Sequence, residues 1–228
     1  MSIASFIDNP LGYSKAHVVT FSGALVDVGP PAVGMQVANA YDNWAGAWKA
    51  EYYTRVAGTF TDLRFLESTS KADGSTGHRI GKGAKAMHTI AGLTTAADKG
   101  IRYLPWKADH MTFMEIDAAA TRFFTGPLSG CAIYIGRATG GGNYWAFHAN
   151  RNGTGAVNNG LKASMLLDTL PLIGGATVSV VHACNYGQDY LDYGFVFGEK
   201  RSGVWTFYVA DTRALGGGNS ATVVNKLR

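Results

Sequence analysis

Apolar and polar positions alternate in short runs through the second half of the chain. The runs CAIYI, YWAFHA, ATVSVVHA, YGFVF, VWTFYVA and ATVV follow one another from residue 131 onward, with glycine-rich segments between them. Short apolar and aromatic runs separated by turn residues are typical of β-strands. The pattern therefore predicts a β-sandwich or a closed sheet in this half of the chain.

The first half of the chain has a more mixed pattern. It predicts a strand or strand pair from His17 to Val28, a helix over residues 34–50 and strand structure within 51–65. Residues 68–83 are rich in glycine, serine and lysine and predict a surface loop. A strand followed by a short helical turn is expected over 110–122.

These elements belong to one fold class. No linker divides the chain, so we expect a single domain over residues 1–228. The expected class is α+β, mainly β, with a β-sandwich core, a few peripheral helices and long loops. Hydrophobic residues make up 46% of the chain, which is enough material for a packed core.

Charge and hydropathy exclude several classes of partner. The formal net charge of +4 is mildly basic and favours an acidic partner, but there is no basic stripe and no finger-type spacing of cysteine and histidine. We therefore expect no nucleic-acid partner. No apolar run is long enough for a membrane span, and the first residues lack the pattern of a signal peptide.

The segment 129–149, SGCAIYIGRATGGGNYWAFHA, carries the candidate chemistry. Its two apolar runs around RATGGGN predict a β-hairpin. If the turn is centred between Thr139 and Gly140, Cys131 lies directly opposite His148 on one face, with Cβ atoms roughly 4.5–5.5 Å apart. A shift of one residue would place the two side chains on opposite faces.

A thiol beside an imidazole suits nucleophilic catalysis. The imidazole shifts the thiol toward the reactive thiolate, and Gly130 permits a backbone angle that could aim N–H groups at an oxyanion. The alternative is that Cys131 is a small buried hydrophobe and His148 a core histidine. His182 and Cys184 share one face of another strand, but further ligands are lacking, so we predict packing there and no metal site.

Several motifs in residues 103–150, about a fifth of the chain, resemble a known family. The segments are Leu104-Pro105-Trp106-Lys107, Phe123-Phe124-Thr125, Leu128-Ser129-Gly130-Cys131, and a tryptophan, Trp145, shortly before His148. They resemble the Burkholderia lethal factor-like and cytotoxic necrotizing factor-like glutamine deamidases. The intervals of six residues from Thr125 to Cys131 and 17 from Cys131 to His148 are similar to those of the bacterial chemoreceptor glutamine deamidases.

The resemblance implies a β-sandwich core and a Cys-His-Thr site that hydrolyses a glutamine carboxamide on a protein, with no cofactor. Cys131 would be the nucleophile and His148 the base and acid. Thr125 would orient His148 through its hydroxyl or main-chain oxygen. The residues implied to line the oxyanion or substrate pocket are Gly130, Ser129, Leu128 and Trp145.

The resemblance also implies a partner, a protein substrate in a host cell. Lethal factor-like enzymes suggest a helicase of translation initiation, and necrotizing factor-like enzymes suggest a Rho-type GTPase. We accordingly expect a monomeric bacterial toxin or effector that acts in the host cytosol and inhibits translation if the helicase is its target. Gly126-Pro127 and a longer Cys131-to-His148 interval depart from the toxin pattern and leave the substrate open.

Three alternatives remain at this point. The chain could be an endogenous deamidase of the chemoreceptor type. It could be a non-catalytic β-sandwich binding module in which Cys131 is merely buried. Transglutamination shares its first half-reaction with deamidation, with an amine in place of water.

Overall fold

The computed structural model describes the second half of the chain almost completely and the first half in parts. The described residues are 3–17, 19–21, 53–55, 63–65, 69–70, 76–77, 88–92, 100–104, 106, 111–150, 156–173, 177–215 and 219–228. The helix predicted over 34–50 lies outside them, as does the predicted strand after Phe21.

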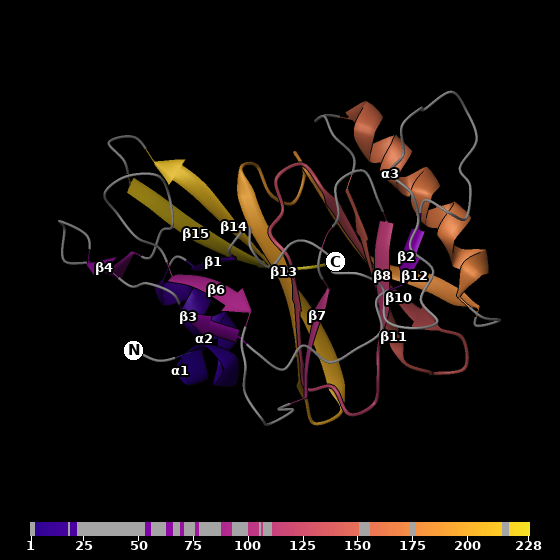
Figure 1. Cartoon of the computed structure of the whole chain (residues 1–228), viewed down its shortest axis with the longest axis horizontal. Coiled ribbons are helices and arrows are strands. Elements are labelled where there is room, and N and C mark those ends of the chain that lie inside the picture. The colour runs from indigo at the N-terminus through magenta and orange to yellow at the C-terminus, as the bar shows by residue number, and fades with distance from the viewer. Residues whose placement is uncertain are drawn as a thin grey trace.

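Two five-stranded sheets form the centre of the protein (Figure 1). The first sheet has the strand order β12-β10-β11-β8-β2, with β12 at Val178–Asn185, β10 at Ala132–Ala138, β11 at Tyr144–Ala149, β8 at Met111–Ile116 and β2 at Tyr53–Arg55. The second has the order β15-β14-β13-β9-β7, with β15 at Asn219–Lys226, β14 at Val204–Leu215, β13 at Tyr193–Arg201, β9 at Arg122–Thr125 and β7 at Ile101–Leu104. Most neighbouring strands are antiparallel, but β2 pairs with β8, and β7 with β9, in parallel.

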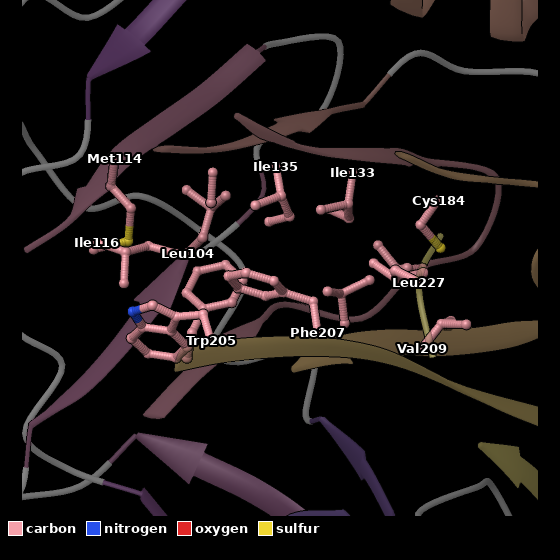
Figure 2. Packing of buried hydrophobic residues seen from close by; sticks show 14 of the residues in the cluster. Leu104, Met114, Ile116, Ile133, Ile135, Cys184, Trp205, Phe207, Val209 and Leu227 are labelled. Carbon is pink, nitrogen blue, oxygen red and sulfur yellow. The ribbon is translucent and has the colours of Figure 1, made fainter. Parts of the chain in front are cut away.

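The two sheets pack face to face around one apolar core. Alternate residues of the first sheet, among them Ile133, Ile135 and Cys184, meet Phe207 and Val209 of β14 in a single buried cluster (Figure 2). Side chains in a strand point alternately to the two faces, so every second residue of these apolar runs reaches this cluster. This arrangement confirms the mainly β, α+β class and gives the protein its β-sandwich core.

Helices cover the outer faces of both sheets (Figure 1). The long helix α3, Ala156–Thr169, continues into a 3-10 turn, η3, at Leu170–Leu172, and places Met165 and Leu166 against outward-facing residues of the first sheet such as Phe147. On the second sheet, Phe6 of α1, Ile3–Asp8, stacks near Phe124 with ring centroids 5.3 Å apart.

The second N-terminal helix and the short strands complete the described fold. Helix α2 spans Pro10–Ala16, and Asn9 caps it by accepting a hydrogen bond from the Gly12 N–H. The remaining strands are β1 at Val19–Phe21, β3 at Leu63–Phe65 and β6 at His88–Gly92, which form one small sheet, and β4 at Thr69–Ser70 and β5 at Thr76–Gly77, which form another.

Two of the local predictions need correction. The segment 68–83 was expected to be a loop throughout, but it contains the paired strands β4 and β5. The residues after β8 form a turn rather than a helical turn, closed by the hydrogen bond from the Ala120 N–H to Asp117 O, because β9 begins at Arg122. The single-domain organisation stays a prediction.

Candidate functional site

The Leu128–Cys131 motif forms a tight turn that leads into β10. Leu128 is fully buried in the core between the sheets, and its backbone exchanges two hydrogen bonds with Gly194 of β13. Gly130 has a φ of +97°, a conformation that residues with a Cβ atom rarely adopt. Glycine at position 130 therefore allows the chain to turn sharply just before Cys131.

Two buried side chains hold the peptide groups on either side of this turn. The hydroxyl of Tyr190 accepts a hydrogen bond from the Gly130 N–H at 3.0 Å and donates one to Cys131 O at 2.8 Å. The ammonium of Lys162, on α3, donates to Gly130 O. Both side chains are fully buried. The backbone around the cysteine is thus fixed from outside its own strand.

The sulfur of Cys131 accepts hydrogen bonds from two donors. The side-chain amide of Asn150 lies 3.1 Å from Sγ, and the backbone N–H of Ser129 also donates to it. The side chain is only 3% exposed. Burial raises the pKa of the Cys131 thiol, while the Ser129 and Asn150 donors and the charge of Lys162 oppose that shift.

The predicted register of the β10–β11 hairpin is wrong by two residues. His148 is paired with Ile133, and continuation of this register places Asn150 opposite Cys131. The reason is the position of the turn, which is centred between Gly140 and Gly141, both with positive φ, one residue later than expected.

A shift of two residues keeps the side chains on the same face of the sheet. Cys131 and His148 therefore both point toward the core between the sheets, as diagonal rather than direct neighbours. Residues paired diagonally lie roughly 7–8 Å apart. Long side chains can span this distance, but the backbone positions alone do not bring the two side chains within hydrogen-bonding distance.

His148 is buried and neutral. Its side chain is fully inaccessible, and neither ring nitrogen has a hydrogen-bond partner among the described residues. Burial, together with the nearby charge of Lys162, lowers the pKa of His148 to about 3. The imidazole therefore carries no charge near neutral pH and has both nitrogens free for a substrate or a water molecule.

Thr125 does not orient His148 in this structure. Its hydroxyl donates to Gly126 O at 2.9 Å and accepts from the Val196 N–H at 3.0 Å, which ties β9 to β13 in the second sheet. The threonine that lies directly opposite His148 is Thr112 on β8, which is also fully buried.

The structure corrects three of the four residues expected to line a pocket. Trp145 is an odd number of positions from His148, so it points to the outer face of β11 and packs against Phe113 below α3. Leu128 is a core residue, and the Gly130 N–H is already bonded to Tyr190. Ser129 is exposed and directs its backbone N–H at the Cys131 sulfur.

Sequence patterns did not indicate Lys162, Tyr190 or Asn150. Lys162 and Tyr190 are 32 and 59 positions away from the peptide groups that they hold, and no motif connects them. Asn150 was within reach of the hairpin argument, because a turn centred one residue later pairs it with Cys131. The signal was the pair of glycines at 140 and 141.

The remaining candidate residues have structural positions. Cys184 is a fully buried core residue, as predicted, and lies opposite Ile133. No group of three or more metal-ligating side chains occurs in the described part of the chain.

A cavity of about 920 Å³ opens between β12 and β14–β15, lined by Asp189, Arg213, Lys226 and Arg228 among others. Cys131 and His148 are not among its lining residues. Asp109 and His110 lie outside the described residues.

Comparison with known proteins does not assign the chain to a family. No protein-family model matches it, and no curated protein matches it. Among the helices of the described residues, none has the length and apolar character needed to cross a membrane.

Proposed function

We propose that this protein is a cysteine-dependent protein-glutamine deamidase that uses Cys131 as nucleophile and His148 for proton transfer. One observation carries the proposal: the Cys131 sulfur lies at a glycine turn with positive φ, accepts hydrogen bonds from Asn150 and Ser129, and shares a sheet face with His148. Hydrogen-bond donors at the sulfur favour the thiolate, which is the nucleophilic form.

The reaction would proceed by acyl transfer. The Cys131 thiolate, whose proton has passed to solvent, attacks the carboxamide carbon of a glutamine, and the C–N bond then breaks. The departing ammonia takes the N–H proton of neutral His148 while the other ring nitrogen takes up a proton from solvent. Water, deprotonated by the same imidazole, hydrolyses the thioester to glutamate and frees the thiol. A neutral His148 with unpaired ring nitrogens suits the second step, in which it must accept a proton from water.

The substrate would approach Cys131 from the side on which Ser129 lies. Ser129 is exposed and Asn150 is half-buried, whereas Cys131 and His148 are enclosed by both sheets. A glutamine side chain is long and narrow, so it could reach the sulfur while the rest of the substrate protein stays outside. The side-chain amide of Asn150 then stands next to the attacked carbonyl and is a candidate oxyanion donor.

The substrate class follows from the resemblance in the Leu128–Cys131 motif. The first candidates are a helicase of translation initiation and a Rho-type GTPase of a host cell, which would make the protein a toxin or effector. A chemoreceptor of the same bacterium is the candidate for an endogenous enzyme.

The test is intact-mass analysis of these candidate proteins after incubation with the enzyme. We expect a gain of about one mass unit at a single glutamine, since an amide becomes an acid. Cys131→Ala should abolish the gain, and Cys184→Ala should retain it, because Cys184 is the other buried thiol and only packs in the core. Equal activity of the two variants would place the chemistry elsewhere.

A non-catalytic β-sandwich binding module is the second candidate, and the burial of Cys131 favours it. Alkylation with iodoacetamide separates the two. For an enzyme we expect Cys131 to react faster at neutral pH than a thiol in the unfolded chain does. A slower reaction, as burial alone would cause, would support the binding module.

A further inference from the structure

Lys162 is an unusual residue for the place where it lies. It belongs to α3, its side chain is fully buried, and its ammonium donates to Gly130 O, the carbonyl immediately before Cys131. Lysine is almost never fully buried unless it is paired. A buried ammonium needs an anion to compensate for its lost hydration.

The structure offers few candidates for that anion. In the described part of the chain, the ion pairs join Arg102 to Asp117, Arg201 to Glu199 and Arg213 to Asp211, and none involves Lys162. Burial lowers the pKa of Lys162, and the charge that opposes this shift is that of the Cys131 thiolate. The carbonyl that Lys162 bonds directly precedes Cys131, so the Cys131 thiolate is the candidate for that anion, and the charge of Lys162 opposes the rise in the pKa of the thiol that burial causes.

His148 cannot provide the balancing positive charge as readily. It is buried on the same face as Cys131, and the Lys162 ammonium acts against its protonation. Two other buried ionisable groups near Cys131 are Cys184 and Tyr190, and burial raises the pKa of both, while the negative charges of Asp189 and Asp211 raise the pKa of Cys184 further. Lys162 is thus the group beside the sulfur that carries positive charge.

We propose that Lys162 is a positioning residue for the nucleophile: its buried ammonium stabilises the Cys131 thiolate and fixes the Gly130 carbonyl, leaving His148 neutral for proton transfer. Loss of the thiol proton to solvent breaks the S–H bond, and the resulting thiolate belongs to the residue directly after the carbonyl that the Lys162 ammonium, which keeps its three protons, bonds. The inference rests on the proposed function, since it supplies the charged state of the nucleophile, but the ion pair is a property of the free protein.

The first test measures the reactivity of Cys131 against pH without any substrate. In a Cys184→Ala background Cys131 is the only thiol, so iodoacetamide reports on it alone. Lys162→Gln keeps an amide donor for Gly130 O but removes the charge. In this variant we expect the alkylation rate of Cys131 at pH 7 to fall about tenfold and the midpoint of the pH profile of alkylation to rise by about one unit. Each pKa unit changes the thiolate fraction tenfold.

Two further variants separate charge from structure. Lys162→Arg should keep the midpoint of the wild type, because it keeps the positive charge. Lys200→Gln is the matched control, since the Lys200 ammonium also donates to a backbone carbonyl, that of Ala118, away from Cys131. An unchanged midpoint in Lys162→Gln, or an equal shift in Lys200→Gln, would overturn the proposal.

A reciprocal test does not depend on the folding of a Lys162 variant. Replacing Cys131 by alanine removes the thiolate, so the pKa of Lys162, followed by NMR of labelled lysine side chains, should fall further below its ordinary value. A pKa of Lys162 that is the same with and without Cys131 would contradict the ion pair.

Failure of this inference and failure of the proposed function give different results. If the wild-type protein deamidates a target, but replacing Lys162 leaves the pH midpoint of Cys131 alkylation unchanged, the ion pair is wrong and the enzyme proposal stands. If the midpoint depends on Lys162 but no target gains mass, the ion pair stands and the deamidase proposal fails.

Discussion

At the scale of the residue, the candidate site consists of polar groups that are buried at a cost in free energy. His148 has lost its hydration and has no protein partner among the described residues, and the buried Lys162 ammonium donates to one backbone carbonyl, that of Gly130. Unpaired buried polar groups each cost about 1–3 kcal/mol. Such groups are retained where they serve a purpose other than stability, and proton transfer is the purpose proposed for His148.

Acid should unfold the protein partly through His148. Its pKa falls from an ordinary value of 6.5 to about 3 in the folded state, because burial disfavours the imidazolium. The unfolded chain therefore binds more protons between these values. The stability from the neutral imidazole is complete above about pH 6.5 and is lost as the pH falls toward 3.

Urea unfolding at a series of pH values checks this expectation. Between pH 6.5 and 4 the wild type should lose more stability than His148→Gln, by on the order of a few kcal/mol. Comparison with the variant cancels the contribution of carboxylates such as Asp117, whose pKa is lowered by Arg102. Parallel curves for the two proteins would show that His148 is not buried in the neutral form.

At the scale of the element, glycine positions decide how the strands pair and how closely they pack. Gly140 and Gly141 set the turn of the β10–β11 hairpin and hence which residue faces Cys131. Gly198 on β13 allows the aromatic side chains of Trp205 and Phe207 on β14 to lie against its backbone. Gly160 in α3, in contrast, has open space around it.

Alanine at these last two glycines should act in opposite directions. At Gly198 a Cβ would lie 2.8 Å from two ring carbons of Phe207, so Gly198→Ala should destabilise the fold by about 1–3 kcal/mol. Gly160→Ala should stabilise it by about 0.5–1 kcal/mol, since alanine loses less backbone entropy in a helix. Urea midpoints of both variants, measured side by side, test the pair, and shifts of the same sign would be inconsistent with these environments.

At the scale of the whole molecule, the two sheets depend on each other through their shared core. Phe207 stacks on Trp205 with ring centroids 5.5 Å apart (Figure 2). Phe207 also contacts the rings of Phe123, Tyr144 and His182. The first sheet bears His148, and its strand β10 begins directly after Cys131, while the second sheet anchors Leu128 through Gly194. The site therefore exists only while the sandwich is closed.

We expect the protein to unfold in a single transition that depends on this core. Phe207→Ala should cost about 3–5 kcal/mol, because it leaves a cavity between the sheets. Leu167→Ala, at a helix position that is 66% exposed, should change stability by less than about 0.5 kcal/mol. Circular dichroism and tryptophan fluorescence should give the same midpoint, and two separate transitions would contradict the single-domain prediction.

The sequence by itself determined the architecture of the second half of the chain. Its alternating apolar runs predicted β10 to β15 because each strand must present one face to a core, and this periodicity is visible in the local sequence. The same periodicity placed Cys131 and His148 on one face, a result that survived a register error of two residues because the side-chain period is also two. Helix α3 was not predicted, since its asparagines and Gly160 weaken the helical pattern.

Only the tertiary structure decided which side chains lie close to Cys131 and His148. Lys162, Tyr190 and Thr112 come from a helix, a turn and a strand that are distant in the sequence, and they reach the site because the sheets and α3 pack in one particular way. The same packing points Trp145 away from the site and uses the Thr125 hydroxyl in a hydrogen bond with the Val196 N–H. Local patterns encode faces and turns, whereas contacts between distant elements depend on how whole faces pack, and that information is spread over the entire chain.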